Sequence, residues 1–361
     1  MELELLIHKI KGTLSNRPTD KRIDLFLETI FEEYNTVLHG LNKKNIGELL
    51  SEKYLQTIEH IEQRILQCFK DYFNGNLYGA IVEMDMLLQD INIVDGFNTS
   101  VLKRDDIWYR GRLREDGVCL YKRQEMFHIP EHLREKVNSQ RFSFNGYPCL
   151  YLGKSIWACW EELDEPHLDD ICFSAFKLKE NLNLLDLSIP TEEMLKTMSI
   201  IDYPKILITL PLAIACSVKT VNEKVNFKSE YIIPQLMMVN LINSRYFEGF
   251  VYSSTKKNPA LNWKEEYLLN IVLPVMGDFD ENGLCKVLKE QFTITSPIYY
   301  KYEFLKSHVS NMITASNQEI DQIFEKNYYD QKSEDNEKEL YPRALFGQME
   351  DILNNMEFIQ I

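Results

Sequence analysis

Residues 141–163 read RFSFNGYPCLYLGKSIWACWEEL and place an arginine before a turn, a tyrosine on a short strand and a glutamate on the helix that follows. Asn145-Gly146 predicts the turn, because glycine adopts positive φ values freely. The alternation from Tyr147 to Leu152 predicts a strand, with Tyr151 on the face opposite the leucines. This stretch therefore predicts a turn, a strand and a helix that each carry a chemically active side chain.

The helix of this stretch is predicted to begin after Ser155, because Gly153 interrupts the strand and serine is a favourable N-cap. It is expected to run to Leu163. At helical spacing Ser155, Ala158 and Glu162 share one side, where the small residues leave room for a ligand. The carboxylate of Glu162 is therefore a candidate for contact with a bound molecule.

Four pieces of this stretch follow one another in a recognisable order: Arg141-Phe142-Ser143, Gly146, Leu150-Tyr151-Leu152 and Glu162. This order resembles the core of the RES domain family. The family is named for arginine, glutamate and serine, and its toxin members degrade NAD+. Phe142 stands where relatives often carry tryptophan, which is a conservative departure.

Two further segments extend the resemblance to about half of the chain, in the family's order. Tyr109-Arg110-Gly111-Arg112 is similar to the family's opening Tyr-Arg-x-Arg. Gly249-Phe-Val-Tyr-Ser253-Ser254, with Asn262 downstream, is similar to the late element that carries the family's serine. The set is more specific than any one of its pieces.

Composition indicates a globular protein of a reducing compartment. The chain has 361 residues, and its 55 acidic and 40 basic residues give a formal net charge of −15. Such a charge argues against non-specific binding to nucleic acid or to an anionic membrane. Seven scattered cysteines form no Cys-x-x-Cys pair or zinc-like spacing, so no metal site is predicted. With no signal peptide and no apolar run of about eighteen residues, a cytoplasmic protein is expected.

The predicted fold class is α+β, because strands and helices alternate irregularly rather than in strand–helix–strand units. The resemblance implies an ADP-ribosyltransferase-like RES domain at residues 105–295. An α-helical N-terminal domain at 1–98 and a helical C-terminal extension at 296–361 are expected to flank it. Toxin relatives are commonly compact single domains, so both additions are departures that are expected to serve regulation, dimerisation or antitoxin binding.

The N-terminal region carries apolar residues at helical spacing, including Leu25 to Tyr34 and Leu55 to Phe69. Some relatives of the RES family carry a helical domain of the HEPN type here, a type that includes ribonucleases with an Arg-x4-6-His motif. The one literal match, Arg123 to His128, lies outside the region and before a proline. An HEPN-like but catalytically silent bundle is therefore expected.

The remaining segments are predicted from periodicity and turn residues. The predictions are a linker at 95–106; strands at 108–113, 171–178, 182–187 and 267–273; a helix from Tyr231 to 242; a strand and turn at 249–254; helices at 302–324 and 345–356; and a solvated charge run at 330–339. Residues 206–218 fit a buried strand or a short helix equally well.

The resemblance implies that four residues carry the chemistry of cleaving nicotinamide from ribose. The guanidinium of Arg141 suits a pyrophosphate, since its planar fork pairs with phosphate oxygens. Tyr151 offers a ring for stacking and a hydroxyl, and Glu162 stabilises a cationic ribosyl carbon. Ser254 would orient nicotinamide or an acceptor. Each of the four also has a purely structural alternative, in the same order: a surface ion pair, a strand tyrosine packed in a core, an exposed helix residue and a turn-forming serine.

Other residues are secondary candidates for substrate binding: Tyr109, Arg110, Ser253 and Asn262. Ser253 is nearly as good as Ser254 by spacing. Glu161 is the neighbour with which Glu162 is most easily confused, but helical position and family spacing both select Glu162.

The resemblance implies an NAD+ phosphorylase or glycohydrolase, with phosphate or water as acceptor and NAD+ as substrate rather than cofactor. A toxin of a toxin–antitoxin pair or a phage-defence effector is the expected role, with an antitoxin or regulatory protein and a homo-oligomer as partners. An ADP-ribosyltransferase acting on a macromolecule and an inactive, partner-binding RES scaffold are the alternatives. No Gly-x-Ser-x-Gly, Gly-rich phosphate loop or His-Glu-x-x-His motif supports another enzyme class.

Overall fold

The computed structural model describes residues 2–15, 21–42, 51–94, 96–114, 121–197, 202–222, 224–244, 246–256, 265–299 and 345–361. Its helices are α1 (Glu2–Ser15), α2 (Ile23–Asn42), α3 (Glu52–Phe73), α4 (Leu77–Val94), α5 (Ile156–Glu162), α6 (Glu192–Thr197), α7 (Tyr203–Cys216), α8 (Ile232–Ser244), α9 (Lys286–Gln291) and α12 (Leu345–Asn354). Its strands are β1 (Thr99–Leu102), β2 (Ile107–Leu113), β3 (Cys149–Gly153), β4 (Ile171–Leu178), β5 (Leu182–Asp186), β6 (Gly249–Ser253), β7 (Leu269–Pro274), β8 (Phe292–Ile294), β9 (Ile298–Tyr299) and β10 (Ile359–Gln360). Asn262, the predicted helix at 302–324 and the charge run at 330–339 lie outside the described residues.

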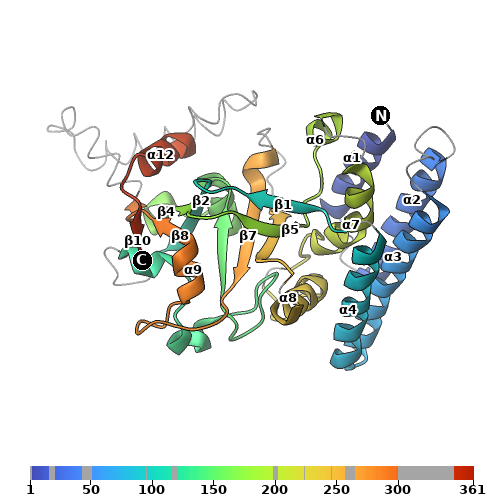
Figure 1. Ribbon diagram of the computed structural model, residues 1–361, viewed down its shortest axis with the longest axis horizontal. Helices are drawn as coiled ribbons and strands as arrows, with labels where there is room; N and C mark the ends of the chain where they lie inside the picture. The colour runs from blue at the N-terminus through green and yellow to red at the C-terminus, as the bar shows by residue number, and fades with distance from the viewer. Residues whose placement is uncertain are drawn as a thin grey trace.

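The described strands form one 10-stranded sheet in the order β1-β5-β6-β7-β3-β2-β4-β8-β10, with β9 beside β4. Among these strands β5 and β6 run parallel, and the other pairs are antiparallel. A mixed sheet with helices in irregular order confirms the predicted α+β class. Figure 1 shows the N-terminal helices at one end of the sheet and the C-terminus, with α9 and α12, at the other.

The two faces of the sheet pack into different cores, because side chains alternate along each strand. We call the side that carries Tyr109, Tyr151 and Tyr252 the tyrosine face. Toward β6 this face packs against α7 and α8, and toward β2 and β4 it packs against α5 and α12. The opposite face holds a third core that includes Leu150 and Val251. The tyrosine face is therefore covered by two groups of helices.

The N-terminal helices do not have a core of their own. The buried apolar residues of α1 to α4 belong to one cluster with those of α7, α8 and the β6 end of the tyrosine face. The hydroxyl of Tyr34 on α2 donates a hydrogen bond of 2.7 Å to the carbonyl of Leu207 on α7. The helices at 1–98 thus complete the core that supports the sheet.

Two segments differ from the predictions made from local pattern. The predicted linker at 95–106 contains β1, which pairs with β5 from Thr99 opposite Leu185 to Leu102 opposite Leu182. The C-terminal extension, predicted as helical, ends in β10, which pairs with β8. Both strands are too short to show a period, and their partners are distant in sequence.

The ambiguous segment 206–218 is the helix α7, which contains Pro211 and is buried almost throughout. A helix that is apolar on all sides must be enclosed by neighbours, and here α2, α3 and α8 enclose it. None of the helices in the described ranges combines the length and apolar character needed to cross a bilayer.

The predicted N-cap of α5 is confirmed, and α3 begins at a serine cap of the same kind. Ser51 accepts a hydrogen bond from the backbone N–H of Tyr54 at the start of α3. Ser155 accepts one of 3.0 Å from the N–H of Ala158 at the start of α5. These local signals place the C-terminal end of α5, and with it Glu162, beside the sheet.

Candidate active site

The register of four neighbouring strands builds the centre of the candidate site. Tyr252 on β6 pairs with Asn270 on β7, Asn270 pairs with Gly153 on β3, and Gly153 pairs with Tyr109 on β2. Paired residues project on the same face of a sheet, so this row lies on the tyrosine face. At Gly153 a Cβ atom would lie 2.8 Å from the Sγ of Cys159 on α5. The absent side chain therefore lets α5 pack closely on the sheet.

Arg141 lies 8% exposed and is held by neutral groups. Its Nη1 donates hydrogen bonds to the carbonyls of Cys216 (3.0 Å) and Val218 (3.1 Å), at and just beyond the C-terminal end of α7. Its Nη2 donates one of 2.8 Å to the Oγ1 of Thr255, and its guanidinium lies 5.3 Å from the ring centre of Tyr231. Among the described residues it forms no ion pair. Within the described ranges the positive charge is therefore held in place without a neutralising carboxylate.

Two phenols lie on the tyrosine face, and Tyr252 is the one that interacts with the charge of this arginine. The hydroxyl of Tyr151 donates a hydrogen bond of 3.1 Å to the Oγ of Ser143. Burial raises the pKa of Tyr151 well above its ordinary value. Burial also raises the pKa of Tyr252, and the charge of Glu162 and the phenol of Tyr151 raise it further, while Arg141 lowers it. Tyr252 is thus within electrostatic reach of all three, and both phenols are protonated donors at neutral pH.

Glu162 is half-buried and is oriented by the sheet. Its Oε1 accepts a hydrogen bond of 2.8 Å from the Nδ2 of Asn270. Its backbone carbonyl accepts one of 2.9 Å from the Nζ of Lys256, which also pairs with Asp164 at 2.8 Å. The structure brings Glu162, rather than its neighbour Glu161, to Asn270.

The segment after β6 links the arginine to the glutamate, and the predicted serine lies within it. Ser254 donates its backbone N–H to the carbonyl of Leu268 (2.8 Å), and its Oγ accepts from the N–H of Lys256 (3.3 Å). Its neighbour Thr255 contacts Arg141, and Lys256 contacts Glu162. The Ser254 hydroxyl therefore shapes the turn that joins the two sides. We call Arg141, Tyr151, Glu162, Tyr252, Ser254, Thr255, Lys256 and Asn270 the Arg–Glu cluster.

Tyr109, Arg110 and Ser253, the secondary candidates that the structure describes, do not join the cluster. Tyr109 lies on the tyrosine face but donates its hydroxyl to Asn354 on α12 at 2.9 Å. Arg110 and Ser253 alternate onto the opposite face, and burial followed by the charge of Arg112 lowers the pKa of Arg110 to about 10. The sequence could not separate these residues from their neighbours, because spacing does not reveal which face a strand turns to a site.

The cluster also contains residues that the sequence analysis did not single out: Tyr252, Thr255, Lys256 and Asn270, with Ser143 and Tyr231 at its edge. Tyr252 and Thr255 flank the predicted serines, so proximity to the motif was the signal available for them. Asn270 is 108 positions from Glu162 and carried no local signal.

Arg123 and His128, the two residues of the Arg-x4-His match, form hydrogen bonds to nearby structural groups. The Nε2 of His128 accepts a hydrogen bond of 2.9 Å from the N–H of Cys285, and its Nδ1 lies 2.8 Å from the carbonyl of Ile129. Burial lowers the pKa of His128 to about 4. Arg123 donates to the Oγ of Ser296 at 2.8 Å. The histidine is therefore a buried residue whose two ring nitrogens both have partners. In the described ranges no group of His, Cys, Asp and Glu is arranged to hold a metal ion.

Comparison with known proteins identifies a bacterial relative. The chain is 31% identical over 306 residues to the Bacillus subtilis (strain 168) protein named "Putative toxin YopC". The alignment covers 79% of this chain and 67% of that protein. No protein-family model matches the chain, and no solved structure matches it.

Proposed function

The chain belongs to the family of the Bacillus subtilis protein named "Putative toxin YopC", and on that premise we propose that it is a toxin that degrades NAD+. The name of the relative supports the toxin role. The resemblance of its motifs to the RES family supports the chemistry and an ADP-ribosyltransferase-like arrangement of the sheet. The helices at 1–98 would be an HEPN-like region without catalytic residues.

The observation that carries this proposal is the buried guanidinium of Arg141, whose partners among the described residues are carbonyls, a hydroxyl and an aromatic ring. A buried charge without a partner is costly, so an anionic group of a ligand would be favoured beside it. A pyrophosphate meets this requirement and matches the guanidinium fork. The turn after β6 contacts Arg141 through Thr255 and Glu162 through Lys256. A pyrophosphate at Arg141 would therefore place the adjoining ribose near the carboxylate of Glu162.

In the proposed reaction the bond between the ribosyl C1′ and the nicotinamide nitrogen breaks, and its electron pair leaves with nicotinamide. Glu162 stabilises the cationic ribosyl carbon, and Asn270 holds the carboxylate in position. An oxygen of water or phosphate then bonds to C1′. When water attacks, its proton is lost, and Glu162 is the base proposed to take it. The protonated phenols of Tyr151 and Tyr252 serve as hydrogen-bond donors to the ribose or carboxamide.

The test is NAD+ consumption by the purified chain, freed of any bound inhibitor. We expect Arg141→Lys and Glu162→Gln each to lower the rate at least about 100-fold, as loss of a transition-state contact does. Arg104→Lys and Glu135→Gln, at exposed positions, are matched controls. Products made with and without phosphate would distinguish ADP-ribose from ADP-ribose phosphate.

Two other outcomes would redirect the proposal. NAD+ left intact by the folded wild type, with no transfer to a protein or nucleic acid, would favour an inactive RES scaffold that binds a partner. Labelling of a macromolecule from NAD+ would favour an ADP-ribosyltransferase. An antitoxin or regulatory protein, a homo-oligomer and a role in phage defence remain part of the proposed biology, in the cytoplasm.

A further inference from the structure

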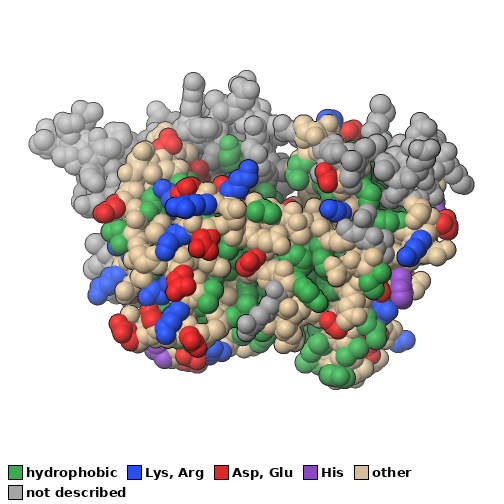
Figure 2. Space-filling view, in the orientation of Figure 1, with side chains coloured by type: hydrophobic (Ala, Val, Ile, Leu, Met, Phe, Trp, Pro, Cys, Tyr) green, Lys and Arg blue, Asp and Glu red, His purple; other side chains and the backbone are tan. Residues whose placement is uncertain are grey.

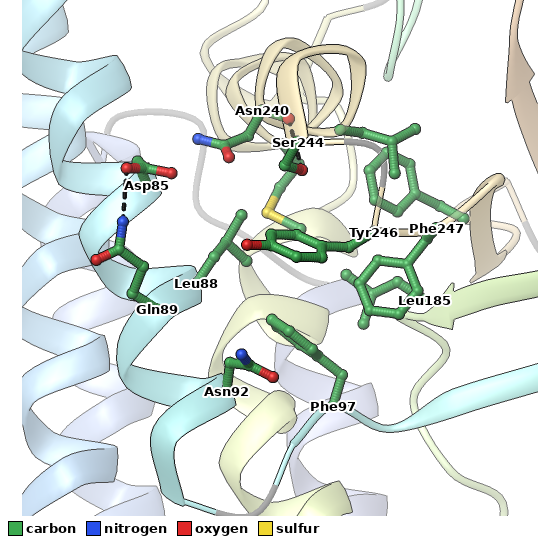
Figure 3. Close-up of a pocket in the computed structure, with 13 residues that line it drawn as sticks. Asp85, Leu88, Gln89, Asn92, Phe97, Leu185, Asn240, Ser244, Tyr246 and Phe247 are labelled. Atoms are coloured by element: carbon green, nitrogen blue, oxygen red, sulfur yellow. Dashed lines mark hydrogen bonds between the residues drawn. The ribbon is translucent and has the colours of Figure 1, made fainter.

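A concavity lies between α4, α8 and the start of β6, and none of the residues that line it belongs to the Arg–Glu cluster. Its volume is about 100 Å³. Figure 3 shows Leu88 and Asn92 of α4 on one side, Asn240 of α8 on another, and Tyr246 with Phe247 beside them. In Figure 2 hydrophobic side chains reach the surface along the seam between α8 and α4. We call this concavity the α4–α8 pocket.

The polar feature of the pocket is the amide of Asn240. Asn240 is 5% exposed and lines the pocket, and its backbone carbonyl accepts the hydroxyl of Ser244 at 2.9 Å. Within the part of the chain that the structure describes, its side-chain amide has no hydrogen-bond partner. Buried amides are normally hydrogen-bonded, since an unpaired one loses its hydration without compensation. The pocket therefore presents both a donor and an acceptor to a ligand.

The apolar feature is an aromatic wall. The rings of Phe97 and Phe247 meet edge to face, with centroids 5.1 Å apart and planes at 89°. Phe250, buried in β6, also lines the pocket, and Tyr246, 69% exposed, lies at its edge. Such surfaces favour a flat ring packed against them.

The charge of the lining residues and the volume of the pocket restrict the class of ligand that it can bind. Among the described lining residues the one charged group is Asp85, which accepts a hydrogen bond of 2.8 Å from Gln89. No lysine or arginine is among these lining residues, so an anionic ligand is disfavoured. The volume of about 100 Å³ is below the roughly 300–1,000 Å³ of sites for drug-sized ligands. A single ring with one small substituent fits this space, and a nucleotide does not.

We propose that the α4–α8 pocket binds a small, neutral aromatic carboxamide, whose ring packs on the phenylalanines and whose amide pairs with Asn240. Nicotinamide is a member of this class. Its relevance as the product released by the chain rests on the proposed function, whereas the binding itself does not.

The experiment follows methionine methyl resonances of the full chain while nicotinamide is added. Met237 lines the pocket and its methyl signal, assigned with Met237→Leu, reports a ring placed there. We expect a saturable shift with nicotinamide and none with benzoate, its anionic counterpart. Asn240→Leu should weaken binding at least about tenfold, because it removes the amide pair. Asn243→Leu, the same change at an exposed position of α8, should leave it unaltered.

A second blocking variant and the cluster variant complete the test. Leu88→Trp fills the pocket from α4 and should abolish the shift even if Asn240→Leu fails to fold. Arg141→Lys should keep it. The proposal is overturned if nicotinamide leaves Met237 unshifted, if benzoate binds equally well, or if Asn240→Leu and Leu88→Trp bind like wild type. A shift lost in Arg141→Lys but kept in Asn240→Leu would place nicotinamide at the cluster instead, and would overturn this inference without touching the proposed function.

Discussion

Arg141 and Arg64 show how differently two arginines of this chain are held. Arg64 bonds to Glu83 and Asp90 at 2.8 Å each, so its charge is compensated within the N-terminal helices. Arg141 is more buried, and its partners among the described residues are carbonyls, a hydroxyl and a tyrosine ring. Carbonyls at the end of a helix stabilise a cation only in part. This contrast is the reason that we propose Arg141 as an anion-binding residue.

Asn270 is predicted to act on catalysis through Glu162. Asn270→Leu removes the 2.8 Å bond to the carboxylate, and hydrogen bonds to charged groups are worth about 1.5–3 kcal/mol. We therefore expect kcat for NAD+ cleavage to fall about 10- to 100-fold, with KM little changed. Steady-state kinetics separate the two constants.

Asn243→Leu, at an exposed position of α8, is the matched control for Asn270→Leu. A rise in KM at constant kcat would show that Asn270 contributes to substrate binding alone. Equal loss of activity in both variants would remove the positioning role.

His128 predicts a pH dependence of stability. Its pKa falls from 6.5 to about 4 on folding because of burial. A depressed histidine pKa means that the unfolded chain takes up the proton first, so stability is full above pH 6.5 and is lost as the pH falls toward 4. The difference corresponds to about 3 kcal/mol at most. Urea unfolding at pH 7.5 and pH 5 measures it, and His128→Gln should show a smaller decline. An equal decline in both proteins would assign the effect to other groups.

At the scale of elements, α5 is the helix that positions Glu162 against Asn270 of the sheet. It is a short helix, Ile156 to Glu162, and most of its residues are buried. Its start is tied by Ser155, whose hydroxyl also donates to the carbonyl of Tyr267 at 2.7 Å. Its end is tied by Asn270 and Lys256. Glu162 therefore depends on contacts at both ends of one helix.

The two serine caps provide a paired prediction. Ser155→Ala and Ser51→Ala each remove a cap, which costs about 0.5–2 kcal/mol of stability. We expect Ser155→Ala also to lower NAD+ turnover, because α5 carries Glu162, and Ser51→Ala to leave turnover unchanged. Urea unfolding and kinetics on both variants test this. Equal turnover in the two variants would show that the position of α5 does not depend on its cap.

On the scale of the whole molecule, the helices at 1–98 and the sheet share one apolar core. Leu185 of β5, Phe250 of β6 and Val272 of β7 belong to the same cluster as the buried residues of α1 to α4. Aromatic packing continues this core to the site, since Phe142 stacks on Phe250 with centroids 5.3 Å apart. The residue next to Arg141 is thus supported by the same core.

Removal of residues 1–94 is therefore predicted to prevent folding of the remaining chain. The cut would expose the buried surfaces of α7 and α8 that pack on α3 and α4. We expect the full chain to unfold in one transition and the shortened chain to lack a cooperative transition by circular dichroism. A shortened chain that unfolds cooperatively would establish the helices as a separate domain.

Local pattern predicted most of the elements around the site. The strand and the helix within residues 147–163 were predicted with the serine cap and with Tyr151 on the observed face, because alternation and capping act within a few residues. Gly153, predicted to interrupt the strand, is instead its last residue and pairs with Asn270 and Tyr109. The helices α2 and α3 followed from apolar spacing in the same way. Leu25, counted in one stripe, is 48% exposed, since a period does not say where neighbouring elements end.

What the sequence alone determined is therefore the short-range structure and the identity of Arg141, Tyr151 and Glu162 as candidates. Tertiary structure decided which groups meet them: the carbonyls of Cys216 and Val218 for the arginine, and Asn270 for the glutamate. It also decided that Arg110 and Ser253 lie on the face of the sheet opposite the Arg–Glu cluster. The physical reason is that capping and alternation act between near neighbours, whereas strand register and the packing of α5 and α7 depend on contacts between residues far apart in the chain.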